Sequence, residues 1–191
     1  MKVALFFGSF NPVHVGHLIL AQTVLNATDC KRVWFVISPH NPHKDKKSLL
    51  NAHDRLRLCE LALEDRDDVR PSNVEFSLPQ PSYTIDTLTA LAERHPKHEF
   101  CLLMGGDNLA TLHKWKKYEV IVERYPIVVY PRPGAEPPSQ NYPNVSLLAG
   151  APMLDISATQ IRELIAAGKS VRYMVPDKAL EYIRSRGLYG A

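Results

Sequence analysis

The sequence predicts an α/β fold built on a doubly wound, mostly parallel sheet with a small C-terminal helical part. Short apolar runs alternate with segments of helical periodicity along nearly the whole chain, which is the pattern of βαβ units. The runs KVALFF at 2–7 and EFCLLM at 99–104 carry few polar side chains, as strands buried on both faces of a parallel sheet do. With 191 residues, the chain is expected to form one domain over 1–191.

In the first half of the chain, each apolar run is followed by a helical segment. After the run at 32–37, the segment 38–50 comes before the next helical segment. It contains two prolines, two histidines and three lysines without periodicity, and it is expected to be an unusually long loop. Long loops of this kind are often functional. Strands are expected at 2–7, 32–37 and 69–76, and helices at 16–25, at 52–63 and from a cap within Ser82–Thr84 to about Arg94.

The second half repeats this alternation and is punctuated by proline and glycine. Five prolines over 131–143 predict irregular surface chain. The helical pattern over 108–123 is expected to break in its middle, and strands are expected at 99–104, 127–130 and 145–148. The last two helices are expected at 158–167, capped by Ser157 and closed by Gly168, and at 177–186, with Pro176 in the first turn and Gly187 after the end. This order of elements is Rossmann-like.

Composition and charge exclude several classes of protein. Hydrophobic residues make up 45% and charged residues 23% of the chain, as in an ordinary globular protein. The net charge of +3 is too small to indicate a nucleic-acid partner, and the sequence has no basic stripe with interleaved aromatic residues. The first apolar run is too short for a membrane span or a signal peptide. Cys30, Cys59 and Cys101 are far apart without metal-ligand spacing, which favours reduced, buried thiols and a cytoplasmic protein.

The segment Gly8–His17, GSFNPVHVGH, follows the first expected strand and is rich in residues that suit a ligand site. Ligands of open parallel sheets bind beyond the carboxyl ends of the strands, and a helix N-terminus attracts anions. His14 and His17 are three residues apart, so their rings can point to the same side of the first turn. Two other interpretations of His14 and His17 remain. One histidine caps the helix while the other lies on the surface, or the two bind a metal ion, for which no third ligand is nearby.

A second candidate segment, DISATQIR over Asp155–Arg162, opens a late helix. Ser157 can cap this helix, and Thr159 and Arg162 are three residues apart, so a hydroxyl and a guanidinium share one face beside the exposed amides. A capped amphipathic helix without any function is the alternative. Together with the first segment, it supplies two anion-binding helix termini, which suit a polyphosphate better than a single phosphate.

These two segments carry a resemblance to a known family. Gly8–His17 resembles the H-x-G-H signature of the nucleotidyltransferase α/β phosphodiesterase superfamily, and Asp155–Arg162 resembles its late I-S-S-T-x-I-R motif. Three further matches are Pro42–Lys44, Pro81–Thr87, and Gly105–Asn108 followed by Lys114-Trp115. Over nearly the whole chain, the sequence is similar to the bacterial nicotinate mononucleotide adenylyltransferases. These enzymes join ATP and nicotinate mononucleotide into nicotinate adenine dinucleotide and release pyrophosphate.

The resemblance implies a role for each matched residue. The residues expected to bind ATP are Gly8, Ser9, Phe10, His14, His17, Gly105, Asp107, Arg132, Ser157, Thr159 and Arg162, and those expected to act in catalysis are His14, His17 and Arg162. The residues expected to bind the mononucleotide are Lys44, Thr84, Trp115 and Lys116, with the indole stacked on the pyridine ring and the amide of Lys116 near the carboxylate. Magnesium would arrive with ATP, and no metal site of the protein's own is expected.

The chain departs from the family pattern at two positions. Asn11 stands where the family usually has Asp, and Ala158 stands where it usually has a second Ser. We expect both to be tolerated with a mild effect on ATP affinity. Nicotinamide mononucleotide or phosphopantetheine are alternative acceptors, and a non-catalytic nucleotide-binding module is a more distant alternative. Trp115 could instead pack on the core, and Lys44 could belong to a merely charged loop. The sequence does not indicate an oligomeric state.

Overall fold

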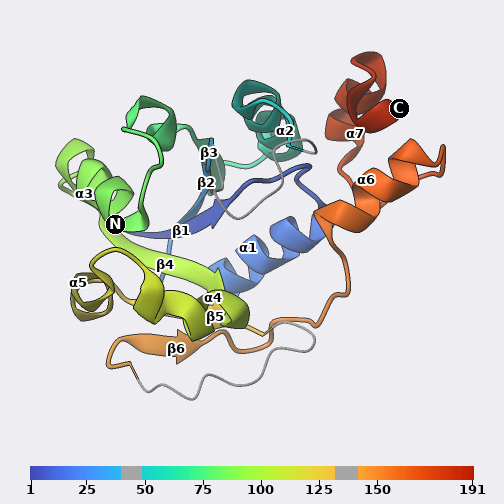
Figure 1. Ribbon diagram of the computed structural model, residues 1–191. Coiled ribbons are helices and arrows are strands. Elements are labelled where there is room, and N and C mark those ends of the chain that lie inside the picture. The colour runs from blue at the N-terminus through green and yellow to red at the C-terminus, as the bar shows by residue number, and fades with distance from the viewer. Residues whose placement is uncertain (40–48, 132–141) are drawn as a thin grey trace.

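A computed structural model describes residues 1–39, 49–131 and 142–191, and its centre is a parallel sheet of six strands (Figure 1). The strand order is β3-β2-β1-β4-β5-β6, and each pair of neighbours is parallel. This is the strand order of the Rossmann fold, so the predicted fold class is confirmed. The strands are β1 Lys2–Gly8, β2 Arg32–Ile37, β3 Val69–Ser72, β4 Glu99–Gly105, β5 Ile127–Tyr130 and β6 Val145–Leu147.

Helices cover both faces of the sheet, because successive side chains of each buried strand point to opposite faces. Ala4 and Phe6 of β1 belong to one core, and Val3 and Leu5 belong to the other. The first core packs under α1 Val15–Ala27, α2 Ala52–Leu63, α6 Ala158–Ala166 and α7 Asp177–Ser185. The second packs under α3 Thr84–Arg94, α4 Gly106–Thr111 and α5 Tyr118–Arg124. Short 3-10 turns are formed by Val74–Ser77, Leu112–Lys114 and Leu188–Gly190.

The place where the winding of the sheet reverses decides where a ligand can bind. The chain winds outward from β1 through β2 to β3, then crosses to β4 on the other side of β1. β1 and β4 run side by side, with Phe6 opposite Leu103. The carboxyl ends of these two strands therefore form the topological switch point, where ligands of this architecture bind.

One sequence prediction near β3 is wrong. The strand expected over 69–76 ends at Ser72, and a 3-10 turn follows. Pro71 lies in this edge strand and has no backbone N–H, so it cannot donate a hydrogen bond to a further strand on the open side of β3. The cap of α3 lies within Ser82–Thr84, as predicted. Tyr83 occupies the cap position without a side-chain hydrogen bond, and Ser82 Oγ donates to Glu75 Oε2.

The helical pattern over 108–123 is interrupted, as expected. α4 ends at Thr111, and α5 begins at Tyr118 after Lys117, which has a φ of 51°. A non-glycine residue in this left-handed region cannot continue a right-handed helix. Near the C-terminus, Ser157 caps α6 as predicted, while Pro176 takes the cap position of α7 rather than a place in its first turn.

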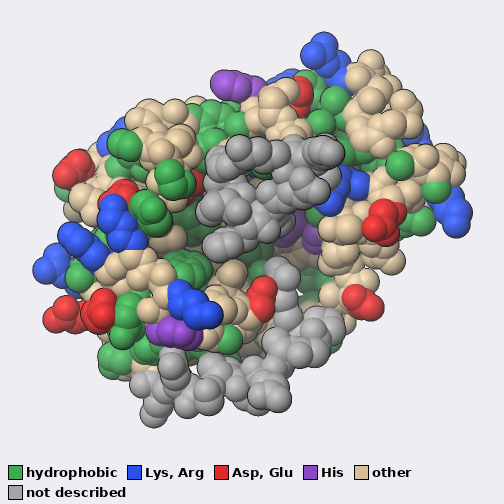
Figure 2. Space-filling model, viewed as in Figure 1, with side chains coloured by type: hydrophobic (Ala, Val, Ile, Leu, Met, Phe, Trp, Pro, Cys, Tyr) green, Lys and Arg blue, Asp and Glu red, His purple; other side chains and the backbone are tan. Residues whose placement is uncertain are grey.

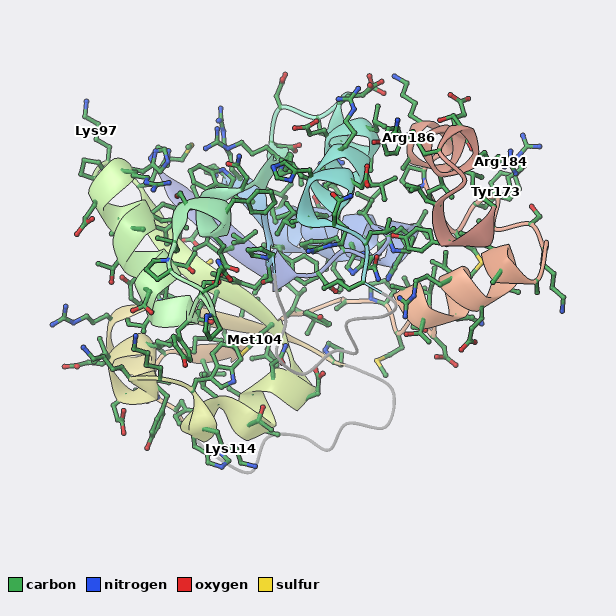
Figure 3. All side chains as sticks on the ribbon, turned by 45° about the horizontal axis from the view of Figure 1, so that its top comes forward. Lys97, Met104, Lys114, Tyr173, Arg184 and Arg186 are labelled. Carbon is green, nitrogen blue, oxygen red and sulfur yellow. The ribbon has the colours of Figure 1, made fainter. Side chains whose placement is uncertain are left out.

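The C-terminal helices pack beside α1 and α2 rather than forming a separate lobe. Figure 3 shows Tyr173, Arg184 and Arg186 together on this part of the chain, away from Met104 at the end of β4. Tyr182 on α7 donates a hydrogen bond of 2.8 Å to Asp54 Oδ1 on α2. Cys30, Cys59 and Cys101 are buried and free, as predicted. Within the described ranges, no helix has the length and apolar character needed to cross a membrane.

Candidate active site

A cavity of about 520 Å³ opens at the carboxyl ends of β1 and β4. Its walls come from the loop between β1 and α1, the start of α4 and the segment before α6. Figure 2 shows histidine surface in the depth of the hollow near the centre of the molecule, with acidic side chains close to its rim. The predicted ATP-site residues that line it are Gly8, Ser9, Phe10, His14, His17, Asp107, Ser157 and Thr159.

The two predicted histidines lie together at the first turn of α1. His14 is the cap residue, and its backbone N–H donates to His17 Nδ1 at 3.2 Å. The ring centroids are 3.7 Å apart with a tilt of 30°. His14 therefore has both expected properties: it occupies the cap position of the helix, and it lines the cavity.

Aromatic side chains hold the ring of His17 in place. Its centroid lies 5.7 Å from that of Phe6 and 5.0 Å from that of Phe10, with edge-to-face geometry in both pairs. Phe10 in turn stacks on Phe35 of β2 at 4.9 Å. Because the core fixes these rings, the imidazole can act as a preorganised donor toward the cavity.

Gly16 allows the two predicted motifs to approach each other closely. A Cβ added at this residue would lie 2.8 Å from Ile156 Cγ2 and 3.0 Å from His14 Nδ1. Neither distance is compatible with ordinary van der Waals contact. A side chain at position 16 would therefore displace the side chain of Ile156, of His14 or of both.

The late motif contacts the first motif through Arg162. Its Nη1 donates to the backbone carbonyl of Asn11 at 2.8 Å, and its Nη2 donates to Thr159 Oγ1 at 3.3 Å. Ser157 Oγ accepts the N–H of Gln160, so this cap is formed as the sequence predicts. Arg162 stands behind the described lining of the cavity, whereas Thr159 is part of it.

Asn11, one of the two departures from the family pattern, is a junction of three segments. It is 3% exposed, and its Oδ1 accepts hydrogen bonds from Tyr189 Oη at 2.9 Å and from the N–H of Leu50 at 3.3 Å. Burial raises the pKa of Tyr189 well above its usual range, so this hydroxyl stays protonated as a donor. Sequence reasoning missed Tyr189 because nothing in the pattern near the C-terminus points to the first loop. Ala158, the other departure, begins α6 and lines the cavity.

Sequence reasoning also missed Arg55 on α2. Its side chain is 0% exposed, and its guanidinium donates to the backbone carbonyls of residues on both sides of the long loop and of Ser9. The signal was available, because Arg55 precedes the apolar residues Leu58 and Cys59 by three and four positions. This spacing places it on the buried face of the helix.

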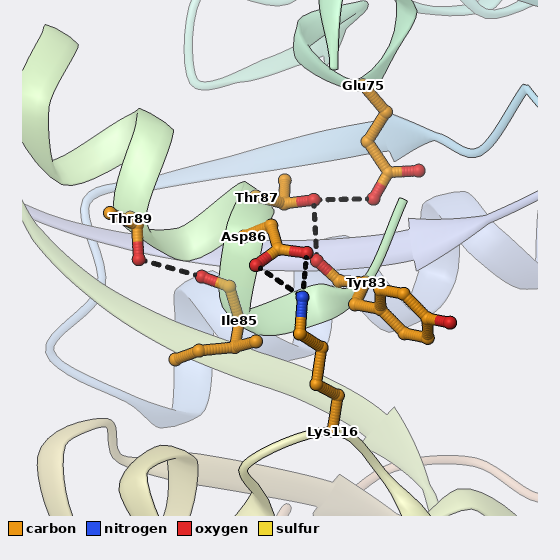
Figure 4. Close-up of polar contacts among 7 residues, drawn as sticks. All are labelled: Glu75, Tyr83, Ile85, Asp86, Thr87, Thr89 and Lys116. Atoms are coloured by element: carbon orange, nitrogen blue, oxygen red, sulfur yellow. Dashed lines mark hydrogen bonds and ion pairs between the residues drawn. The ribbon is translucent and has the colours of Figure 1, made fainter. Parts of the chain in front are cut away.

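Lys116, one of the residues expected to bind the mononucleotide, lies beside Tyr83 and Asp86 at the start of α3 (Figure 4). Lys116 Nζ pairs with Asp86 Oδ2 at 2.8 Å and lies 4.7 Å from the centre of the Tyr83 ring. Thr84 begins α3, and Trp115 is half-buried against the second core. The structure thus brings the two predicted segments together. Among the described residues, the lining of the cavity itself does not include Gly105, Thr84, Trp115 or Lys116.

The buried carboxyl group of Glu75 accepts hydrogen bonds from residues at the start of α3, beside Tyr83 and Asp86. Glu75 is 3% exposed and accepts hydrogen bonds from Ser82 Oγ at 3.0 Å and from Thr87 Oγ1 at 2.8 Å. Burial raises the pKa of Glu75 above its ordinary value, and the hydroxyl donors oppose this shift. The need of this carboxyl for donors explains why Ser82 turns away from the helix start.

Lys44 and Arg132, assigned to the mononucleotide and to ATP respectively, lie outside the described residues. Over 1–39, 49–131 and 142–191, no group of three or more His, Cys, Asp and Glu side chains is arranged to hold a metal ion. The carboxylates in the lining of the cavity are Asp107 and Asp155, and both are exposed. One or two carboxylates are what Mg²⁺ usually takes from a protein when phosphates supply its other ligands.

Comparisons with known proteins agree with this geometry. The cytidylyltransferase-like family model matches residues 5–164. A protein of Flavobacterium johnsoniae, named "Probable nicotinate-nucleotide adenylyltransferase", is 47% identical over 192 residues and covers 99% of both chains. A protein of Caldicellulosiruptor bescii with the same name is 42% identical over 197 residues, again with 99% of both chains covered.

A solved structure supports the fold independently. The nicotinic acid mononucleotide adenylyltransferase of Plasmodium falciparum, described as complexed with NaAD, superimposes with a TM-score of 0.81. The alignment covers 98% of this chain and 97% of that one at 19% identity. The match of the family model over most of the chain, and relatives that are similar over their full length, show that the chain belongs to the nicotinate-nucleotide adenylyltransferase family of cytidylyltransferase-like enzymes.

Proposed function

We propose that the protein transfers the adenylyl group of ATP to nicotinate mononucleotide, giving nicotinate adenine dinucleotide and pyrophosphate in NAD biosynthesis. The observation that carries this proposal is the meeting of two helix N-termini, those of α1 and α6, at one cavity at the switch point of the sheet. Such termini bind anions through their free amides and dipoles. Full-length relatives named for this activity support the same function.

The reaction is an attack of the 5′-phosphate oxygen of the mononucleotide on the α-phosphorus of ATP. The bond from the α-phosphorus to the bridging oxygen breaks, and pyrophosphate leaves with the electron pair. A phosphate nucleophile is already ionised and needs no general base. Catalysis then depends on aligning the two substrates and on stabilising negative charge at the α-phosphate and the bridging oxygen.

We assign this stabilisation to His14 and His17 at the start of α1. Ser157 and Thr159 would hold the β- and γ-phosphates from the start of α6, and the backbone around Gly8–Phe10 would complete the cradle. Arg162, bonded to Thr159 and to the carbonyl of Asn11, would add its positive charge to the same phosphates. Asp107 would lie toward the ribose, and Arg132 toward the adenine. Magnesium would enter as part of the Mg·ATP substrate and neutralise phosphate charge, and Asp107 and Asp155, the carboxylates in the described lining of the cavity, would help to hold it.

For the mononucleotide, we assign Trp115 to stacking on the pyridine ring, Thr84 and the backbone amide of Lys116 to its carboxylate, and Lys44 to its phosphate. The ion pair between Lys116 and Asp86 supports a role for the backbone amide of Lys116, because its ammonium group is already engaged. The free, buried cysteines support a reducing compartment, and we propose the cytoplasm.

The test is pyrophosphate release by the purified protein with Mg·ATP and one of three acceptors: nicotinate mononucleotide, nicotinamide mononucleotide or phosphopantetheine. The proposal requires a clear preference for the nicotinate compound. Turnover with another acceptor would retain the ATP site and overturn the mononucleotide assignments. ATP binding without turnover on any acceptor would favour a non-catalytic nucleotide-binding module.

The histidine assignment is tested by His17→Ala. Removal of one preorganised donor typically costs about 2.7–4 kcal/mol of transition-state stabilisation, so kcat should fall by roughly 100- to 1000-fold. Circular dichroism should show an unchanged fold. A normally folded His17→Ala protein with wild-type kcat would exclude this role.

A further inference from the structure

Arg55 is a buried arginine whose hydrogen-bond partners among the described residues are all backbone carbonyls. Its Nε donates to Leu50 at 3.0 Å, its Nη1 donates to Ser9 at 2.7 Å and to Ser38 at 2.8 Å, and its Nη2 donates to Pro39 at 2.9 Å. The side chain is 0% exposed. A fork of rigid donors thus joins three points of the chain: the loop after β1, the end of β2 and the segment before α2.

The bond to Ser9 has a consequence for the cavity. A trans peptide is planar, so its carbonyl and the N–H of the following residue point in opposite directions. Because the Ser9 carbonyl is turned toward Arg55, the N–H of Phe10 is turned away from it. Ser9 and Phe10 both line the cavity, and Phe10 has a positive φ of 45°, which its neighbours must hold in place.

The charge of Arg55 has a second consequence. Burial lowers the pKa of Arg55, but a guanidinium remains protonated in proteins. Its hydrogen-bond partners in the described part of the chain are carbonyls and not carboxylates, so these partners leave its positive charge in place. A buried charge interacts over a longer range than a charge screened by salt. It therefore adds positive potential beneath a loop that we assign to phosphate binding.

We propose that Arg55 is a positioning residue for adenylyl transfer, which orients the Ser9–Phe10 peptide toward the triphosphate and holds this loop in register with the chain ends at Pro39 and Leu50. This inference rests on the proposed function. Arg55 does not line the cavity, so it acts through the loop rather than by touching a substrate.

The test is Arg55→Lys, which keeps the charge but cannot reach four carbonyls with one ammonium group. A loop displaced by about 1 Å can cost on the order of 100-fold in rate, so kcat should fall by about that factor, with a smaller change in KM for ATP. Kinetics are measured well below the unfolding temperature. A role in stability alone would lower Tm and leave kcat unchanged at that temperature, and this result would overturn the proposal.

Arg66→Lys is the matched control. Arg66 also joins separate parts of the chain, through Asp68 and Gln22, but it lies just before the amino end of β3, whereas Arg55 contacts residues that follow the carboxyl ends of β1 and β2. This variant should lose some stability and keep wild-type kcat. An equal fall in kcat for both variants would show that the effect is not specific to Arg55, and would also overturn the proposal.

A measurement on the wild-type protein covers the case in which Arg55→Lys does not fold. The Nε–H of Arg55 should give a slowly exchanging NMR signal in the ligand-free protein, and Mg·ATP should not change its exchange rate, because the donors are already engaged. Rapid exchange that slows only with Mg·ATP would contradict preorganisation. If the wild type shows no turnover, the proposed function fails, while ATP affinity of the variant, measured by calorimetry, still tests whether Arg55 shapes the phosphate site.

Discussion

A single methyl group at Gly16 should separate the two halves of the site. In Gly16→Ala, the added Cβ would meet Ile156 Cγ2 at 2.8 Å and His14 Nδ1 at 3.0 Å, so at least one of these side chains must move. Ile156 lies in the segment that presents Ser157 to the cavity, and His14 lines the same cavity. The strain therefore falls on both proposed phosphate-binding elements.

The effect on stability should be modest because two contributions oppose each other. Alanine is favoured over glycine in a helix by at most about 1 kcal/mol, and overpacking typically costs about 1–3 kcal/mol. The net loss should be no more than about 2 kcal/mol, which lowers Tm by up to about 8 °C in a chain of this size. The effect on rate should be larger, since displacing an aligned group can cost on the order of 100-fold.

The assay compares pyrophosphate release and thermal unfolding of Gly16→Ala with those of Gly168→Ala. Gly168 has a φ of +68° and no atom within 4 Å of an added Cβ, so its substitution strains only the backbone, by about 1–2 kcal/mol. Both variants should unfold at lower temperature, and only Gly16→Ala should lose activity. A Gly16→Ala enzyme with wild-type kcat and KM would refute the claim that close approach of the two motifs builds the site.

Three further predictions address other parts of the site. Trp115→Ala should raise KM for nicotinate mononucleotide in steady-state kinetics and leave that for ATP nearly unchanged, whereas equal weakening would indicate a packing role. Glu75 has a raised pKa, so the folded state binds its proton more tightly than the unfolded state, and stability should fall as pH rises from the ordinary glutamate pKa through the raised one; melting curves of Glu75→Gln should lack this component, and identical pH profiles would exclude it. Tyr189→Phe removes the donor to Asn11 and should lower the free energy of unfolding by about 0.5–1.5 kcal/mol in urea titrations, while an unchanged midpoint would show that this bond contributes nothing.

Much of the architecture could be predicted because it depends on local patterns. Strands buried on both faces are apolar throughout, and β2 and β5 begin and end where the sequence predicts. β3 failed because the apolar residues Val74 and Phe76 pack from a 3-10 turn, and periodicity alone cannot separate such a turn from a strand. The cap of α3 falls within the predicted residues, but it has no side-chain hydrogen bond, and the hydroxyl of Ser82 bonds to a tertiary partner, Glu75.

The site was predictable to the extent that it is contained in contiguous segments. His14 and His17 share one turn, and Ser157 with Thr159 shares another, so spacing alone brings each pair together. Arg55 and Tyr189 act over long distances in sequence, and a helix arginine or a C-terminal tyrosine gives no sign of its distant partner. The joining of Arg162 to Asn11 across 151 positions likewise required the fold to be known.

The two arginines beside the first loop also suggest why this site uses carbonyls as arginine partners. Arg162 donates to the carbonyl of Asn11, and Arg55 donates to that of Ser9, two residues earlier. A carboxylate in either place would form a stronger pair but would cancel the positive charge that an incoming triphosphate meets. A neutral carbonyl fixes the guanidinium and leaves the charge in place. In this chain Asn11 accepts a hydrogen bond from Tyr189 without a charge of its own, whereas the aspartate that the family usually has at this position would add a negative charge beside Arg162.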